Sequence, residues 1–171
     1  MKVKMILENN DSIVMELYPE IAPLSVANFL ELIDKKYYDG VIFHRIIKDF
    51  MVQTGGYRFI DEKQSIVEAG DAKSIKGEFM ANGVLNNLKH KLGVVSMART
   101  MVKDSASSQF FICTKDAPHL DGQYAAFGKV VDDASLEVLE KLNNSHTVNV
   151  GGGLTDFPYP IVRIKTIERV N

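Results

Sequence analysis

Hydrophobic and polar residues alternate with a period of two over residues 2–18, around an Asn9-Asn10-Asp11 turn. This pattern predicts two antiparallel strands joined as a hairpin. Pro23 then suits the first turn of a helix, where its missing N–H is not needed. A helical stripe follows it, because apolar residues repeat at the spacing of one helix face: Val26, Phe29, Leu30 and Ile33. A second helix is predicted from Asp132 or Asp133, both suitable N-caps, to Asn143-Asn144.

The other apolar runs are short, and turn-rich stretches rather than regular crossover helices separate them. This organisation favours an antiparallel barrel or sandwich over a parallel doubly wound sheet. Residues 55–92 have weak periodicity and many polar or glycine positions, which is typical of functional surface or of an element that periodicity misreads. The predicted strands are Val41–Ile47, Gly93–Ala98, Gln109–Thr114, Tyr124–Val131 and Ile161–Val170.

Composition narrows the class of protein. A chain of 171 residues with 46% hydrophobic and 25% charged residues fits one globular domain, residues 1–171, that needs no disulfide to support its core. A net charge of −2 provides no basic excess for nucleic acid. The single cysteine, Cys113, and the charged residues near the N-terminus predict a cytoplasmic protein without a membrane segment.

The most common catalytic motifs are missing. The four histidines are far apart, and neither His nor Cys occurs in pairs at metal-ligand spacing, so no metal site is predicted. Gly151-Gly152-Gly153 lacks the context of a phosphate-binding loop, and the serines of residues 105–108 do not form a nucleophile elbow. The sequence therefore predicts neither a metal nor a cofactor.

Two blocks, residues 43–56 and 107–114, mix polar and apolar residues in an unusual way. Arg45 interrupts an apolar strand; taken alone, it would be an edge-strand arginine that faces water. In the second block, strand alternation places Gln109, Phe111 and Cys113 on one face and the residues between them on the other. Gln beside Phe suits a groove that binds both an apolar ring and a peptide amide, and a half-exposed strand is the alternative.

Both blocks, with three further segments, resemble signature segments of the cyclophilins, the peptidyl-prolyl cis–trans isomerases. The segments occur in the family's order and span nearly the whole chain. The resemblance implies a mainly β fold, a closed eight-stranded antiparallel β-barrel capped by two α-helices. The matching segments are FHRIIKDFMVQTGG (43–56), KSIKGEF (73–79), GVVSMA (93–98), SQFFICT (108–114) and LDGQYAAFGKV (120–130).

The resemblance also implies roles for individual residues. It assigns catalysis to Arg45, assisted by Phe50 and Gln53. Without it, Phe50 and Phe111 would be interpreted as core aromatics, and Cys113 is interpreted as a small buried apolar residue. The residues implied to bind substrate are His44, Met51, Ala98, Arg99, Gln109, Phe111, His119, Leu120 and Tyr124.

The implied activity is rotation about X-Pro peptide bonds, without a cofactor. Proline-containing peptides and unfolded or folding proteins are the implied partners, and a monomer is expected. His119 and Tyr124 stand where the best-known eukaryotic members carry Trp and His, so we expect weak binding of the cyclic peptide cyclosporin. Two alternatives remain open: a proline-segment-binding chaperone or scaffold with little turnover, and a barrel that carries a hydrophobic ligand inside.

Overall fold

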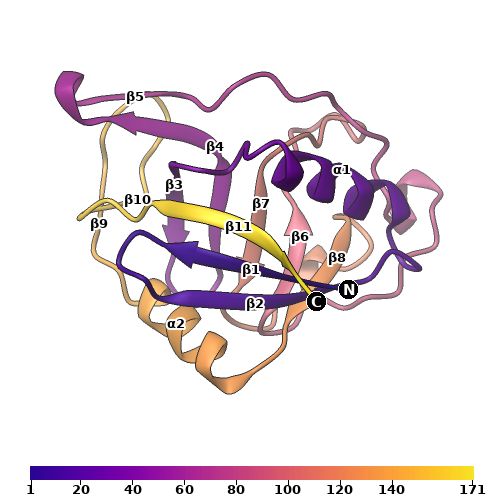
Figure 1. The fold of residues 1–171 in the computed structure, drawn as a ribbon. Helices are drawn as coiled ribbons and strands as arrows, with labels where there is room; N and C mark the ends of the chain where they lie inside the picture. Colours follow the sequence, from indigo (N-terminus) through magenta and orange to yellow (C-terminus); the bar gives the residue numbers. More distant parts are fainter.

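Eight strands hydrogen-bond side by side in one antiparallel sheet that curls into a barrel (Figure 1). The computed structural model describes residues 1–171. The order around the barrel is β11-β1-β2-β8-β6-β7-β4-β3, and β5 pairs with β4 outside this path. The strands are β1 (Lys2–Leu7), β2 (Ser12–Leu17), β3 (Val41–Ile47), β4 (Met51–Ile60), β5 (Ser65–Glu68), β6 (Val94–Met97), β7 (Phe110–Cys113), β8 (Ala126–Val130), β9 (Thr147–Val148), β10 (Phe157–Pro158) and β11 (Ile164–Val170).

Two helices, α1 (Pro23–Asp34) and α2 (Asp133–Asn143), lie on opposite sides of the barrel (Figure 1). Both form where the sequence pattern predicted them. Asp132 is the N-cap of α2, and its carboxylate accepts a 2.7 Å hydrogen bond from the backbone N–H of Ser135. Neither helix has the length and apolar character needed to cross a lipid bilayer. Short 3₁₀ helices cover Asp61–Lys63, Met80–Asn82 and Pro118–Leu120.

The longest strand, β4, is the main element that the sequence pattern did not predict. The adjacent residues Gly55 and Gly56 lie in its middle and have no partners in the ladder with β3, whose register shifts at this point. Glycine is unfavourable inside strands and often marks such a bulge. The two glycines therefore hide the strand periodicity, although the chain continues through them as a strand.

The barrel is not fully closed, which corrects the prediction of a closed barrel. Only an isolated bridge between Ile42 and Arg163 and a few backbone hydrogen bonds join β3 to the segment before β11. Pro158 and Pro160 lie in that segment, and proline has no N–H to donate to a neighbouring strand. A continuous ladder therefore does not form along this seam.

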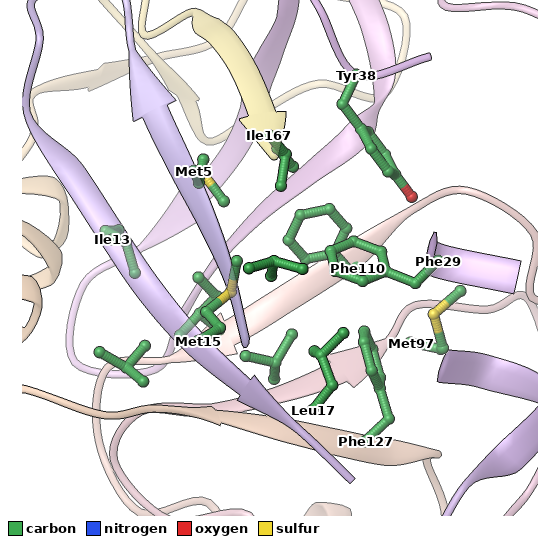
Figure 2. Close-up of a cluster of buried hydrophobic side chains, with 14 of the residues drawn as sticks. Met5, Ile13, Met15, Leu17, Phe29, Tyr38, Met97, Phe110, Phe127 and Ile167 are labelled. Carbon is green, nitrogen blue, oxygen red and sulfur yellow. The ribbon is translucent and has the colours of Figure 1, made fainter. Parts of the chain in front are cut away.

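Side chains from the strands and from α1 fill the interior of the barrel (Figure 2). The buried cluster contains 29 hydrophobic residues. Phe29 of α1 belongs to it, with its ring centroid 5.0 Å from that of Phe110 and 5.2 Å from that of Phe127. Interiors packed in this way have few voids larger than a water molecule. This packing excludes the alternative of a barrel that carries a hydrophobic ligand inside.

Candidate active site

Three neighbouring strands place Arg45, Gln53 and Phe111 in one row across the outer face of the sheet. Arg45 of β3 is paired with Gln53 of β4, which in turn is paired with Phe111 of β7. Adjacent strands lie about 4.8 Å apart, so the row spans about 10 Å. Residues separated by up to 66 positions (111 − 45) in the chain are thereby brought within reach of one small ligand.

A β-bulge at His44 turns Arg45 outward. Phe43 and Arg45 are two residues apart on β3, yet they pair with consecutive residues of β4, so His44 is an extra residue in this strand. In a regular strand Phe43 and Arg45 would share one face. Because of the bulge, Phe43 is completely buried in the core while Arg45 is exposed on the outer face.

His44 does not line the groove, contrary to the prediction. Its ring is buried and packs edge-on against Tyr57, with centroids 4.7 Å apart. Burial, assisted by the charge of Arg45, lowers the pKa of His44 to about 4, so the ring is neutral at pH 7. The prediction is wrong because His44 is the extra residue of the bulge: its ring packs against Tyr57, and it is not among the residues that line the cavity beside Arg45.

Beside Arg45 lies a cavity of about 120 Å³ with a largely apolar wall. A small cluster of buried apolar residues, separate from the barrel core, includes three of its lining residues, Met51, Phe111 and Leu120. The predicted alternation in β7 is confirmed, because Phe110 and Ile112 belong to the barrel core while Phe111 belongs to this cluster. All nine lining residues are among those that the resemblance singled out: Arg45, Phe50, Met51, Gln53, Ala98, Arg99, Phe111, Leu120 and Tyr124.

A chain of hydrogen bonds crosses the groove. Nη1 of Arg45 donates to Oε1 of Gln53 at 3.2 Å, and Nε2 of Gln53 donates to Oε1 of Gln109 at 2.9 Å. Gln109 lines a second hollow, of about 210 Å³, which shares Gln53, Ala98 and Arg99 with the first cavity. With its Oε1 engaged, Gln109 still has amide N–H groups that can donate to a ligand carbonyl. The two hollows adjoin at the three residues that they share, and together we call them the groove.

The Arg99 side chain is fixed between two aromatic rings. Its guanidinium carbon lies 4.7 Å from the ring centroids of both Phe79 and Tyr124. Nε and Nη2 donate to the carbonyl of Gln123 at 3.1 and 2.7 Å, and Nη1 donates to that of Thr100 at 2.9 Å. Such cation–π contacts stabilise the arrangement of the rings. Arg99 lines both hollows, and its contacts hold the ring of Tyr124, which lines the cavity beside Arg45, in place.

Phe50 lines the cavity, whereas His119, predicted to bind substrate, lies beside the Phe50 ring and is not among the lining residues. Their rings are tilted, with centroids 5.4 Å apart, and His119 is exposed. Phe50 follows a turn that α2 holds in place. There the Asn143 side chain accepts from the backbone N–H of Asp49 at 2.7 Å and donates to its carboxylate at 3.1 Å. The position of Phe50 therefore depends on segments far apart in sequence.

His90 supports the groove from behind, and sequence reasoning missed it. Its ring stacks on Phe111 with centroids 6.1 Å apart, Nδ1 lies 3.1 Å from the carboxylate of Asp121, and Nε2 lies 2.9 Å from Oγ of Ser96. A carboxylate only accepts, so Nδ1 carries the proton and Nε2 accepts from Ser96. Burial lowers the pKa of His90 although Asp121 opposes the shift. The sequence around His90 does not predict its contact with Asp121, because the two residues are 31 positions apart in the chain.

Cys113 lies beneath the groove as a completely buried residue, as predicted. Burial, followed by the nearby carboxylates of Asp121 and Asp116, raises the pKa of its thiol to about 12. The thiol is therefore protonated at neutral pH and is not a nucleophile. No group of three or more His, Cys, Asp or Glu side chains is placed to hold a metal ion.

Comparison with known proteins identifies the family. A family model for the cyclophilin type peptidyl-prolyl cis-trans isomerases matches residues 2–169. Peptidyl-prolyl cis-trans isomerase A of Dickeya dadantii is 43% identical over 161 residues, 91% of this chain and 75% of that protein. Peptidyl-prolyl cis-trans isomerase B of Bacillus subtilis is 38% identical over 139 residues, 81% of this chain and 88% of that protein.

A solved structure agrees with these sequence matches. The crystal structure of a Cryptosporidium parvum cyclophilin type peptidyl-prolyl cis-trans isomerase, determined in the presence of the dipeptide Ala-Pro, superimposes with a TM-score of 0.78 at 28% identity. The match covers 100% of this chain and 99% of that one. With the curled barrel and the Arg45 groove, these matches show that the chain belongs to the cyclophilin-type peptidyl-prolyl cis–trans isomerases and is an enzyme of that class.

Proposed function

We propose that this isomerase acts on X-Pro bonds of peptides and of unfolded or folding proteins, with the proline ring in the cavity beside Arg45. The observation that carries the proposal is that one cavity brings the Arg45 guanidinium together with the apolar side chains of Met51 and Phe111. The related crystal structure was determined in the presence of the dipeptide Ala-Pro, which supports this class of substrate.

The size of the cavity fits the ring of a proline. Its volume of about 120 Å³ equals that of about four water molecules in the liquid, at roughly 30 Å³ each. This space accepts the methylene groups of a pyrrolidine ring. The apolar lining favours the ring over a polar side chain of similar size.

Arg45 acts on the amide as it twists. Resonance gives the peptide C–N bond partial double-bond character, and rotation has a barrier of about 18–20 kcal/mol. When the bond twists, resonance is lost and the prolyl nitrogen regains a basic lone pair. The Arg45 guanidinium donates a hydrogen bond to this lone pair, which is scarcely available in the planar ground state. The interaction therefore binds the transition state more tightly than the substrate.

Arg45 alone does not supply the whole acceleration. Shortening isomerisation from tens of seconds to milliseconds requires about 10⁴-fold, or about 5.4 kcal/mol. A hydrogen bond to a charged group contributes about 1.5–3 kcal/mol. The remainder comes from moving the amide into an apolar cavity and from holding the flanking main chain through Gln53, Gln109 and the backbone at Ala98 and Arg99.

Exchange spectroscopy on a short X-Pro peptide tests the assignment. We expect Arg45→Ala to lower turnover by about 10- to 100-fold, the equivalent of one charged hydrogen bond, while the peptide still binds. Arg45→Lys keeps the charge without the planar fork and should retain part of the activity. Arg169→Ala, which removes an exposed arginine paired with Asp34, is the matched control and should behave like the wild type.

Two results would contradict the proposal. A folded Arg45→Ala protein with wild-type turnover would remove Arg45 from catalysis. A wild-type protein that binds the peptide without accelerating its exchange would favour the scaffold alternative. Thermal unfolding of each variant distinguishes lost catalysis from a lost fold.

A further inference from the structure

Residues 99–105 form a turn at the rim of the groove, and its polar groups bond to one another. The hydroxyl of Ser105 accepts from the backbone N–H and from Oγ1 of Thr100, both at 2.9 Å. The same hydroxyl donates to the carbonyl of Val102 at 2.6 Å, and the N–H of Val102 donates to Oγ1 of Thr100 at 3.2 Å. These bonds fix the shape of the turn, which we call the rim turn.

The charged side chains of the rim turn fasten it to a neighbouring segment. Nζ of Lys103 donates to the carbonyl of Ala81 at 2.9 Å. The carboxylate of Asp104 accepts from the N–H of Gly77 at 3.0 Å and from the Asn82 side chain at 2.8 Å. Lys103 and Asp104 are thus directed toward residues 77–82.

The side chains left free in the rim turn are the apolar ones. Met101 is 94% exposed and Val102 is 64% exposed. Met80, on the segment fastened to the rim turn, is also more than half exposed. Single exposed apolar residues are ordinary, whereas Met101 and Val102 are adjacent on a braced turn and form a small exposed apolar patch. Methionine adapts to apolar partners of different shapes, because its side chain is unbranched and polarizable.

The rim turn is continuous with the groove. Thr100 and Ser105 line the hollow of about 210 Å³, and Arg99 lines both this hollow and the cavity beside Arg45. A polypeptide with its proline beside Arg45 that extends over the second hollow would lie next to the rim turn, which carries Met101 and Val102.

We propose that Met101 and Val102 form a docking surface for an apolar side chain of the substrate polypeptide, beyond the residues that flank the X-Pro bond. The inference rests on the proposed function and names the preferred substrate, an unfolded chain with apolar residues near its proline. Continuity with the groove favours this occupant over a second copy or another protein. Because hydrogen bonds already fix the rim turn, binding of the substrate costs the enzyme little conformational entropy in this segment.

The double variant Met101→Ser/Val102→Ser tests this surface with two substrates. The first is an X-Pro tetrapeptide, which offers only the proline and the residues that flank it, and the second is a protein whose refolding is limited by prolyl isomerisation. We expect kcat/KM for the tetrapeptide to stay at the wild-type value. For the refolding protein we expect a loss of about fivefold, or about 1 kcal/mol, mostly through KM.

The matched control is Val67→Ser/Val150→Ser, which removes two exposed apolar side chains that do not line the groove. It should leave both activities unchanged. Equal loss with both substrates, no loss with either, or the same loss in the control would overturn the docking surface. Self-association of the wild type in sedimentation that the double variant abolishes would assign the patch to a second copy instead. A wild type inactive on the tetrapeptide would overturn the proposed function, and the docking surface with it.

Discussion

Two neighbouring residues of β3 have opposite environments. Arg45 is exposed on the outer face and donates a hydrogen bond to Gln53, whereas the His44 ring is buried against Tyr57. Nδ1 of His44 is buried and has no hydrogen-bond partner. A histidine in such a place is favourable only when neutral, because nothing compensates a buried charge. The position of His44 therefore makes the stability of the fold sensitive to acid.

We expect His44 to lower the free energy of unfolding as the pH falls from neutral to about 4. An unfolded histidine titrates near pH 6.5, whereas the folded-state pKa of His44 is about 4. Between these values the unfolded chain binds a proton that the folded chain does not, so the free energy of unfolding falls as the pH falls. His44→Phe keeps a ring and removes the titration. It should reduce the loss of stability between about pH 7 and pH 4.5 by on the order of 2–3 kcal/mol.

Urea unfolding at both pH values measures this difference. His146→Gln, at an exposed position, is the control and should lose as much stability as the wild type. Since the pKa of His90 is also lowered, part of the acid sensitivity should persist in His44→Phe. Equal losses in the wild type and in His44→Phe would contradict the role of His44.

At the residue scale, motif and alternation identified the side chains that line the groove, such as Phe111. They did not separate His44 from Arg45, because one extra residue in a strand has no sequence signature of its own. They also missed His90, whose partners Ser96 and Asp121 come from other segments. Contacts of this kind depend on packing rather than on local pattern.

At the scale of elements, different structural constraints require the two glycines inside β4. Gly55 has a φ of +99°, and a Cβ on it would collide with the backbone carbonyl of Ser108. The φ of Gly56 lies outside the left-handed region, and a Cβ on it would lie 2.5 Å from Nε2 of Gln109. The first glycine is required by the backbone, and the second by a side chain of the groove.

Alanine substitutions should therefore separate stability from activity. Gly55→Ala should lower the free energy of unfolding by about 2–3 kcal/mol, because neither its conformation nor the Ser108 backbone can adapt easily. Gly56→Ala should cost less than about 1 kcal/mol, since Gln109 can move, and should raise the peptide KM by about three- to tenfold. Urea unfolding and peptide exchange measure the two effects. Similar stability losses in both variants would contradict this distinction.

The elements that the sequence predicted correctly are those with local signals. Pro23 and Asp132 begin the two helices, and alternation defines the β1–β2 hairpin. Strand β4 was missed because its two glycines lie at a register shift with β3 and are approached closely by Ser108 and Gln109, which precede β7. Local pattern cannot express a requirement that neighbouring strands impose.

At the scale of the whole molecule, the two ends of the chain meet on neighbouring strands. Lys2 of β1 pairs with Val170 of β11, and Figure 1 shows the termini side by side. Far from them, Gly151, Gly152 and Gly153 form an exposed loop in which an added Cβ would meet nothing within 4 Å. Exposed loops of this kind tolerate chain breaks best.

We expect a circular permutant with joined termini and new ends at Gly152 to fold and to retain peptide exchange activity. A permutant opened between Gly55 and Gly56 should not fold, because this break interrupts the strand between β3 and β7. Circular dichroism and the exchange measurement check both proteins. Loss of the fold in the Gly152 permutant, or an active Gly55–Gly56 permutant, would contradict this expectation.

By itself the sequence determined the two helices, the hairpin, most strands and, through its motifs, nearly all residues of the groove. The helices, the hairpin and the strands depend on residues within a few positions in the chain. The residues of the groove lie in segments that resemble the signature segments of a known family. Tertiary structure decided which way Arg45 faces, that His44 is buried, that the barrel seam stays incomplete and that Arg99 lies between Phe79 and Tyr124. Each of these depends on register and packing between distant segments, and such contacts exist only once the sheet has curled.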